Sequence, residues 1–258
     1  SGSYAAATWQ QSKIWGSEPD LMLVWAETNP HSPRAQNSAA QTWLRLGQPD
    51  RAFAILERAM KDMPDSALLT TSYLSYKAEL GNLSVSELHA GVDRLRKQPF
   101  DAQMLKSLQY LVEIVNARGP LPDHARIIMD LLAGIRENLH KQVPVAHRYT
   151  YYLQGLLLSG QGNGEEAYHY LTEALSHYNS VETGLNIVSM LASHGHFKQA
   201  LGILEQSEHL LETQIDNDLK RYRSTYEQEI LRLRQTIEND ILNARRSNTG
   251  QPDLETHK

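Results

Sequence analysis

Histidine is the residue type in this chain that could most readily bind a metal ion. The 258-residue sequence holds eleven histidines, among them His194 and His196 on either side of Gly195, and His140 and His147 further upstream. A zinc site needs three or four converging ligands, usually with two of them spaced on one helix face. No His-Glu-x-x-His motif is present, and Gly195 is the residue type that a turn between helices requires. We therefore expect no metal and no cofactor.

Paired carboxylates and a glycine-rich segment are the other candidates for chemistry. Glu165-Glu166 and the pair Glu205 and Glu208 could act as acid–base partners. The first pair begins an apolar helical pattern, where acidic residues interact favourably with the helix dipole. Residues 160–164, Gly-Gln-Gly-Asn-Gly, lack the Lys-Ser/Thr of a phosphate-binding loop and predict a turn. Cysteine is absent, which excludes thiolate chemistry. We expect that the chain is not an enzyme.

Composition restricts the classes of partner. The formal charge is −5, and charges of both signs are interspersed without a long basic stripe, so nucleic acid is not an expected partner. No run approaches the roughly 18–20 apolar residues that a membrane helix requires. We expect contact with a membrane only through segments outside this chain. The opening Ser-Gly-Ser resembles the remnant of an expression tag, which predicts an excised fragment.

The elements that would position these residues are helices almost throughout. Hairpin signals and repeated β-branched stretches are absent, whereas apolar residues recur at helical spacing. Residues 4–14 and 20–28 predict two leading helices, and Pro30 ends the second. Ser32 is a good N-cap, with Pro33 at the first helical position. The sequence therefore predicts an all-α fold.

A 34-residue rhythm organises these helices. It is clearest between Pro30 and Pro64 (64 − 30 = 34), and weaker copies occupy 148–180 and 181–206. This period marks a helix–turn–helix unit. Such a unit cannot bury its apolar face alone and must stack on neighbouring units. In the clearest copy the spaced small and apolar residues are Ala40, Trp43, Gly47, Ala52, Leu56 and Ala59.

Residues 207–246 predict one or two long helices, and residues 247–258 a polar, frayed tail. The apolar pattern of 207–246 fits either a helix that caps the open end of the repeats or a coiled-coil seam between two copies. We therefore divide the chain into a repeat array at 1–206, with its clearest copies at 33–65, 148–180 and 181–206, then the C-terminal helix and the tail. The apolar residues of this helix alternate spacings of four and three with one stutter: Ile215, Leu219, Tyr222, Tyr226, Ile230, Leu233, Ile237 and Ile241.

The spaced residues of 33–65 resemble the tetratricopeptide repeat, and this resemblance covers about three repeats with a leading half-repeat. The lead-in to the first repeat is also similar to the segment after the last membrane span of bacterial polytopic sugar-transferase-like proteins, which have a soluble C-terminal tetratricopeptide domain. Transferase chemistry lies in the membrane part of those proteins and is not carried over. The residues that carry this second likeness are Thr8-Trp9, Trp15, Leu21, Trp25, Asn29-Pro30, Ser32 and Arg34-Ala35.

These resemblances imply a tetratricopeptide-like helical-repeat solenoid with a long C-terminal helix. They imply a non-catalytic scaffold for protein–protein interaction, on the periplasmic face of a bacterial inner membrane, in a protein of cell-envelope polysaccharide or glycan assembly. Its partner would be a protein or peptide in the concave groove, with a homodimer through the C-terminal helix as a further interaction.

In tetratricopeptide arrays the first helix of each pair lines the concave groove, so the resemblance also maps candidate partner-binding residues. Two arginines among polar side chains could hold an acidic peptide or a chain terminus. The set does not reproduce the lysine–asparagine clamp of carboxylate-binding arrays, and an ordinary solvated face is an equal alternative. The mapped residues are Arg34, Asn37, Gln41 and Arg45, then Tyr149, Tyr152 and Ser159, then Leu185 and Ser189.

Two other functions fit the same sequence. One is a cytoplasmic tetratricopeptide adaptor without a membrane link. The other is a glycan-binding or enzymatic helical domain that uses the Tyr- and His-rich region 147–178. Its tyrosines either pack between helices or line the groove, where an apolar ring with a hydroxyl suits peptide or glycan contact.

Overall fold

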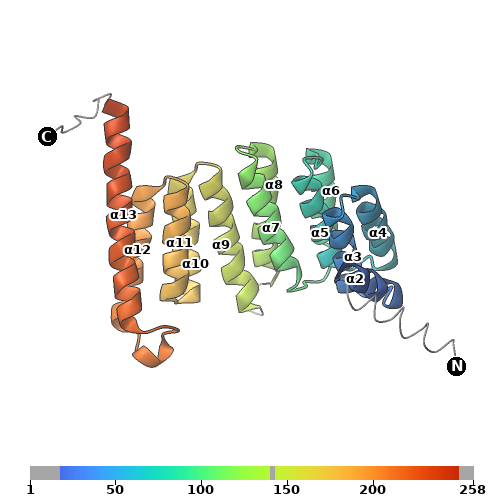
Figure 1. The fold of residues 1–258 in the computed structure, drawn as a ribbon, viewed down its shortest axis with the longest axis horizontal. Coiled ribbons are helices and arrows are strands. Elements are labelled where there is room, and N and C mark those ends of the chain that lie inside the picture. The colour runs from blue at the N-terminus through green and yellow to red at the C-terminus, as the bar shows by residue number, and fades with distance from the viewer. Residues whose placement is uncertain (1–17, 140–142, 250–258) are drawn as a thin grey trace. The chain divides into compact units, whose positions relative to one another are not determined.

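The computed structural model describes residues 18–139 and 143–249 (Figure 1). These residues form α-helices, one short 3-10 helix and no strand, which confirms the all-α prediction for this part of the chain. Two compact units divide the chain: unit 1 runs to Val115 and adds Arg126–Gly134, and unit 2 holds Asn116–Ala125 and everything from Ile135 onward. The helix predicted at 4–14 and most of the tail at 247–258 lie outside the described residues.

In unit 1 each helix packs against the next one along the chain, from α2 to α6. The last two residues of α7 belong to unit 2, and α8 gives its middle, Arg126–Gly134, to unit 1. The helices are α2 (Glu18–Thr28), α3 (Pro33–Arg45), α4 (Pro49–Asp62), α5 (Ala67–Glu79), α6 (Val85–Leu95), α7 (Met104–Ala117) and α8 (Pro122–Leu139).

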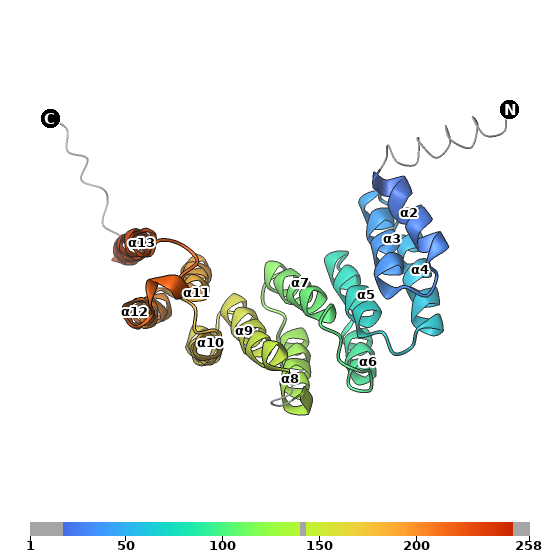
Figure 2. The ribbon, with the colours of Figure 1, turned by 90° about the horizontal axis from the view of Figure 1, so that it is seen from below.

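In unit 2, α9 packs against α10, α11 packs against α12, and α13 packs against both α11 and α12. Figure 2 looks along these helices and shows α11, α12 and α13 as neighbours. The elements are α9 (Pro144–Gly160), α10 (Gly164–Tyr178), α11 (Val181–Ser193), α12 (Phe197–Thr213), the 3-10 helix η2 (Asp216–Asp218) and α13 (Arg223–Thr249).

Local sequence signals start the helices. The Ser32 hydroxyl accepts a hydrogen bond from the N–H of Ala35 at 3.3 Å, with Pro33 at the first helical position, which confirms the predicted N-cap. Ser84 and Glu87 form a capping box: the Ser84 hydroxyl accepts from the Glu87 N–H, and the Glu87 carboxylate accepts from the Ser84 N–H. Each cap satisfies backbone donors that have no partner within the helix.

One turn type joins four of the helix pairs. After α3, the N–H of Gly47 donates to the carbonyl of Leu44 and the N–H of Gln48 donates to that of Trp43. This pair of bonds is the Schellman motif, in which the central residue has a positive φ that favours glycine. The same bonds recur around Gly81, Gly162 and Gly195, all with positive φ. The turns therefore repeat at intervals of 34 (81 − 47) and 33 (195 − 162) residues.

Small residues let the paired helices approach each other closely. In unit 1, Ala40, Ala52 and Ala59 are buried in one apolar cluster. In unit 2, a Cβ added to Gly155 of α9 would lie 2.4 Å from Cγ of Leu171 and 3.2 Å from the carbonyl oxygen of Ala167, both on α10. Position 155 therefore has no room for a side chain.

Hydrogen bonds between successive helix pairs follow the same interval as the turns. In unit 1, the Gln98 amide donates to the carbonyl of Pro64 at 2.7 Å, and Arg94 donates to the carbonyl of Met60 at 2.6 Å. In unit 2, the Gln199 amide donates to the Glu165 carboxylate at 2.8 Å. Each bond joins residues 34 apart in sequence. The arrangement is therefore repeat-like within each unit.

The C-terminal helix α13 covers the apolar face that α11 and α12 leave exposed. Its residues Tyr226, Ile230, Leu233 and Ile237 are buried in one cluster with α11 and α12. Burial of this stripe stabilises the fold by about 25 cal/mol for each Å² of apolar surface that is removed from water. The stripe is therefore occupied within unit 2.

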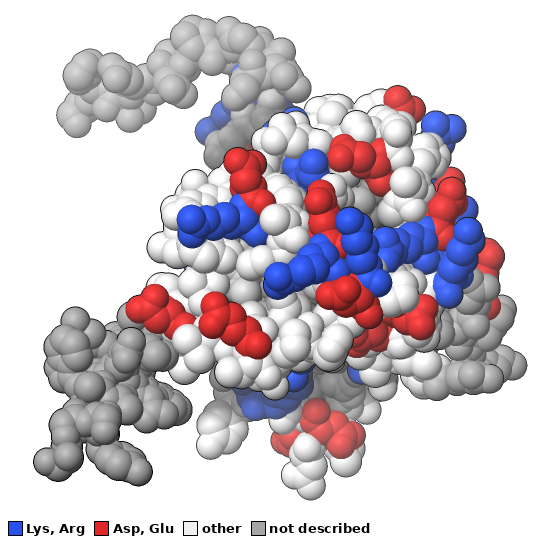
Figure 3. Space-filling view, turned by 90° about the vertical axis from the view of Figure 1, so that its right-hand side faces the viewer, with Lys and Arg blue, Asp and Glu red and all other residues white. Residues whose placement is uncertain are grey.

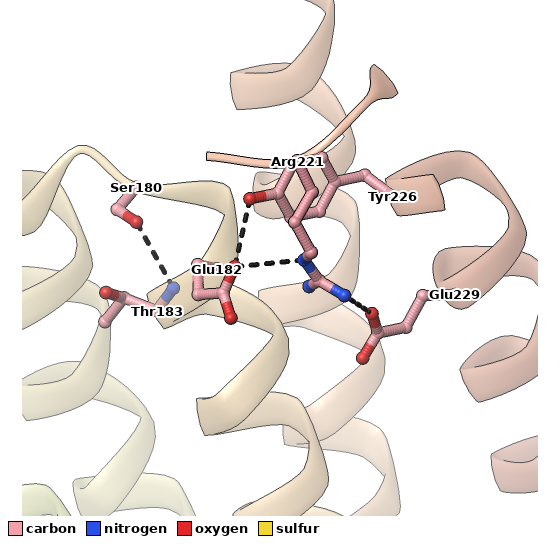
Figure 4. A network of polar contacts seen from close by, with 6 residues as sticks. All are labelled: Ser180, Glu182, Thr183, Arg221, Tyr226 and Glu229. Carbon is pink, nitrogen blue, oxygen red and sulfur yellow. Dashed lines mark hydrogen bonds and ion pairs between the residues drawn. The ribbon is translucent and has the colours of Figure 1, made fainter. Parts of the chain in front are cut away.

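A polar network fixes the start of α13 against the start of α11 (Figure 4). The hydroxyl of the buried Tyr226 donates to the Glu182 carboxylate at 3.0 Å. Arg221 contacts the same carboxylate at 3.2 Å and Glu229 at 2.9 Å, and its guanidinium lies 4.6 Å from the centre of the Tyr226 ring. Glu182 is thus shared between an arginine and a buried tyrosine.

The helical pattern predicted from residue 207 is interrupted between α12 and α13. Ile215 and Tyr222, which the sequence places in the apolar stripe, lie in this connection with 64% and 86% of their surface exposed. Arg223 holds the break: its guanidinium donates to the carbonyls of Leu211 and Gln214 and pairs with Asp216. Periodicity alone misses such a break, because the side chain that satisfies the last carbonyls of α12 comes from the next helix.

Exchange of a glycine for alanine should have opposite effects at two helical positions. Gly155→Ala should lower the free energy of unfolding by about 1–3 kcal/mol, because the new methyl group overpacks against the buried Leu171. Gly134→Ala should raise it by about 0.5–1 kcal/mol, because a Cβ there meets nothing within 4 Å. Urea unfolding followed by circular dichroism measures both, and equal effects would contradict the close approach of α9 and α10.

The Tyr226 hydroxyl should contribute to the stability of unit 2. Tyr226→Phe should lower the free energy of unfolding by about 1–3 kcal/mol, because a buried hydrogen bond to a carboxylate is lost. Tyr222→Phe removes the same atom from an exposed ring and should change stability by less than about 0.5 kcal/mol. Thermal unfolding of the two variants is the measurement, and a neutral Tyr226→Phe would contradict the role given to the network.

Candidate partner-binding site

A hollow of about 240 Å³ lies on unit 1. It collects polar side chains from three helices around a partly apolar rim. Helix α3 contributes the exposed Gln41 and Arg45, both of them predicted site residues. The lining residues are Gln41, Leu44, Arg45, Gly47, Pro49, Tyr76, Glu79, Leu80 and Tyr110.

Helical spacing explains why α3 presents its polar residues together. Asn37, Gln41 and Arg45 are four residues apart, so they form one column on the helix. Alanines 39 and 40 are buried beside this column. The fourth predicted residue of α3, Arg34, is exposed in the first turn and is not part of the lining.

Tyr76 supplies the buried wall of the hollow. Its hydroxyl donates to the Asn37 side-chain oxygen at 3.0 Å. Burial and the nearby Glu79 carboxylate raise the pKa of Tyr76 to about 12, although the Asn37 bond and Arg45 oppose this shift. Tyr76 therefore stays protonated at physiological pH and fixes Asn37 in place.

Tyr110 on α7 also lines the hollow. Burial raises its pKa to about 12, together with a hydrogen bond to the Glu79 carboxylate and the charge of that group. A tyrosine with such a pKa is a poor general acid or base near neutral pH. The two tyrosines are thus hydrogen-bonding groups of fixed protonation.

Besides the exposed Glu79 carboxylate, the polar groups that the hollow exposes are the guanidinium of Arg45 and the amide of Gln41. Both side chains are exposed, and Arg45 forms no ion pair with any other residue between 18–139 or 143–249. A guanidinium presents a planar set of donors that matches a carboxylate. Next to the rim of Leu44, Pro49 and Leu80, this group can bind an acidic or polar peptide segment that also has an apolar side chain.

The polar lining residues Tyr76, Glu79 and Tyr110 were not predicted, and the 34-residue interval could have identified Glu79 among them. Glu79 is 34 residues after Arg45, and Tyr110 is 34 residues after Tyr76. The predicted sites came from the clearest repeats only, and 66–147 matches the repeat weakly. A search at a fixed interval from Arg45 would have found Glu79.

The predicted residues Tyr149, Tyr152 and Ser189 belong to unit 2. The rings of Tyr149 and Tyr152 lie 6.2 Å apart on α9, and Tyr152 also packs against the apolar cluster of this unit. Ser189 is exposed on α11, and its hydroxyl donates to the carbonyl of Leu185 at 3.0 Å. Leu185 is itself buried, so it does not present a side chain to a partner.

The histidine pair considered as a metal site instead links two helix pairs. His194 contacts the hydroxyl of the buried Ser159 at 2.7 Å, and His196 donates to the Ser159 carbonyl at 2.8 Å. Partial burial and the neighbouring His196 lower the pKa of His194. Ser159, mapped to the groove, is thus an internal contact. His140 lies outside the described residues, within which no three His, Asp or Glu side chains are placed to hold a metal ion.

The carboxylates considered as acid–base partners take part in contacts between helices. Glu165 accepts a hydrogen bond from Gln199 and lies 3.7 Å from Lys198. Glu208 pairs with Arg234 of α13 at 2.7 Å. These contacts join α12 to α10 and to α13. Both carboxylates therefore have structural partners.

A larger depression of about 880 Å³ lies on unit 2, between α10, α12 and α13. Its lining includes two acidic residues, Glu165 and Glu205, and two basic residues, Lys198 and Arg245. It contains none of the predicted site residues. The smaller hollow is the better candidate because polar groups from three helices converge on an open guanidinium.

The surface charge is mixed. On the face that Figure 3 shows, basic and acidic side chains are interspersed. Helix α4 alone exposes three cations and three anions, namely Arg51, Arg58, Lys61, Asp50, Glu57 and Asp62. The basic side chains of α4 are therefore accompanied by as many acidic ones, unlike the basic surface that a nucleic acid backbone attracts.

Comparison with known proteins gives no relative from which a site could be transferred. Within residues 18–139 and 143–249, no helix has both the length and the apolar character of a membrane span. No protein-family model matches this sequence, and no curated protein or solved structure matches it either.

Proposed function

We propose that this chain is a non-catalytic interaction module of tetratricopeptide-like helical repeats, and that the hollow of unit 1 binds a peptide segment of a partner protein. Recurrence of one turn at intervals of 34 and 33 residues supports the repeat assignment. So do the hydrogen bonds between residues 34 apart. Both features are expected when one supersecondary unit is stacked on its copies.

The observation that best supports the binding site is the convergence on Arg45. Gln41 and Arg45 of α3 are open to solvent, whereas the hydroxyls of Tyr76 and Tyr110 are already engaged with Asn37 and Glu79. Hydrogen bonds within the hollow therefore hold its shape. The remaining groups are the Arg45 guanidinium, which only donates, and the Gln41 amide, which can donate or accept. Such preorganisation lowers the entropy cost of binding a flexible segment.

The non-catalytic part of the proposal is supported by the protonation states in the hollow. Both tyrosines have pKa values of about 12, far above the operating pH that acid–base catalysis favours. The Glu79 carboxylate accepts the Tyr110 hydroxyl. The groups nearest Arg45 are thus arranged for recognition.

The segment before the first repeat resembles that of membrane proteins with a soluble repeat domain. This resemblance supports a proposal for where in the cell the module lies. We place the module on the periplasmic face of an inner membrane, in envelope polysaccharide or glycan assembly, with a cytoplasmic adaptor as the alternative. This part depends on residues 8–35 alone. Alkaline phosphatase fused after Lys258 of the full-length protein distinguishes the two, because this reporter is active only outside the cytoplasm.

Arg45 should be required for peptide binding. Linear peptides selected from a displayed library against the wild-type chain should bind the Arg45→Ala variant at least tenfold more weakly, because a charge-assisted hydrogen bond contributes about 1.5–3 kcal/mol. Arg34→Ala is the matched control: it removes an exposed arginine of the same helix outside the hollow and should change affinity less than about twofold.

Fluorescence anisotropy with labelled peptides measures these affinities. If the peptides bind the Arg45→Ala variant as tightly as the wild type, the binding site lies outside the hollow. Failure to select any peptide would contradict the interaction module itself.

A further inference from the structure

One charged residue occupies a corresponding place on each of three alternate helices of unit 1. Arg45 is the last residue of α3, Glu79 is the last residue of α5, and Glu113 lies near the end of α7. Successive members are one repeat interval apart (79 − 45 = 34 and 113 − 79 = 34), and all three side chains are exposed. The charge along this row is therefore positive on α3 and negative on α5 and α7.

The three helices are neighbours, so the row is continuous on the surface of unit 1. Helix α3 packs against α5, and the Tyr76 hydroxyl of α5 donates to Asn37 of α3. Between α5 and α7, the Ser75 hydroxyl donates to the carbonyl of Ser107 at 2.8 Å. Each charged residue thus has its successor on the adjacent helix of the row.

Two tyrosines, also 34 residues apart, each lie close to two of these charges. Besides burial, Glu79 raises and Arg45 lowers the pKa of Tyr76. Burial also raises the pKa of Tyr110, together with its hydrogen bond to Glu79 and the charges of Glu79 and Glu113. Charges act on a pKa in this way only when they are near the group. The tyrosine rings therefore add partly apolar surface to the row of charges.

Hydrogen bonds within unit 1 orient both carboxylates. Glu79 accepts the Tyr110 hydroxyl, and Glu113 accepts the side-chain amide of Gln109 at 2.7 Å. An ionised carboxylate has about four lone-pair sites, so a bond of this kind orients the group without using all of its acceptor sites. Because both groups are also exposed, they can accept hydrogen bonds from a partner.

We propose that this row selects an extended partner segment in which one acidic residue is followed, in either chain direction, by two basic residues. The acidic side chain binds Arg45 in the hollow, and the two basic side chains bind Glu79 and Glu113. Their aliphatic stems can pack on the tyrosine rings. The inference rests on the proposed function, because it assigns the chemistry of the segment that the hollow binds.

Helix packing sets the spacing of the three residues in the partner. The axes of packed helices are about 8–10 Å apart, and an extended chain advances about 3.3 Å per residue. Successive charged residues of the partner should therefore be about three residues apart. A segment with a second acidic residue in place of the first basic one would face Glu79 and be repelled.

Removal of the two carboxylate charges tests the row. Peptides selected from a displayed library against the wild-type chain should have the acidic–basic–basic order. They should bind the Glu79→Gln/Glu113→Gln variant at least tenfold more weakly, because two charge-assisted contacts become neutral. Glutamine keeps an oxygen that can accept the Tyr110 hydroxyl, so circular dichroism should show an unchanged fold.

Glu57→Gln/Asp62→Asn is the matched control. It removes the same charge from two exposed carboxylates of α4 and should change affinity less than about twofold. An effect as large as that of Glu79→Gln/Glu113→Gln would mean that net charge alone attracts the peptides, which would reject the row.

Reversal of one charge tests the order directly. A second selection, against the Glu79→Arg variant, should yield peptides with an acidic residue in place of the first basic one. If peptides that require Arg45 lack basic residues, or bind the Glu79→Gln/Glu113→Gln variant as tightly as the wild type, the row is rejected and the hollow is kept. If the peptides do not require Arg45, or if none is selected, both are rejected.

Discussion

The structure depends on one constraint: a pair of antiparallel helices cannot bury both of its apolar sides by itself. Every pair must therefore be covered by a neighbour. If that neighbour is also a helix pair, its own outer apolar side must be covered by the next element. In unit 2 this succession ends at α13, which covers α11 and α12 with Tyr226, Ile230, Leu233 and Ile237. The opposite side of that helix is mostly polar, as the outer surface of a terminal element must be.

Close approach of the paired helices follows from residues that have little or no side chain. Gly155 leaves room for Leu171, and Gly184 leaves room for the buried Ser207. Polar contacts are then added at the ends of the helices, where backbone groups lack partners. Arg223 serves the end of α12 in this way, and Ser159 receives both His194 and His196. Interactions that look like potential chemistry in the sequence thus become parts of the packing.

The hollow of unit 1 follows from the same packing. Regular spacing places Asn37, Gln41 and Arg45 in a column on α3, and a neighbouring pair contributes Tyr76 and Glu79. Since Tyr76 and Tyr110 are engaged with Asn37 and Glu79, the polar groups presented to a partner are the Gln41 amide, the Arg45 guanidinium and the exposed Glu79 carboxylate. Recognition through such groups beside an apolar rim suits an extended segment better than a small molecule enclosed on all sides.

The sequence by itself determined the helices, their caps and their turns, because Ser32, Pro33, Gly47 and the apolar spacing act within a few residues of one another. It also placed Gln41 and Arg45 on one face of α3. Only the tertiary structure decided that Tyr76 and Tyr110 stand beside them, that Ser159 is buried under two histidines, and that Ile215 and Tyr222 leave the stripe of α13. Those outcomes depend on side chains that meet across dozens of residues, and local periodicity contains no information about such contacts.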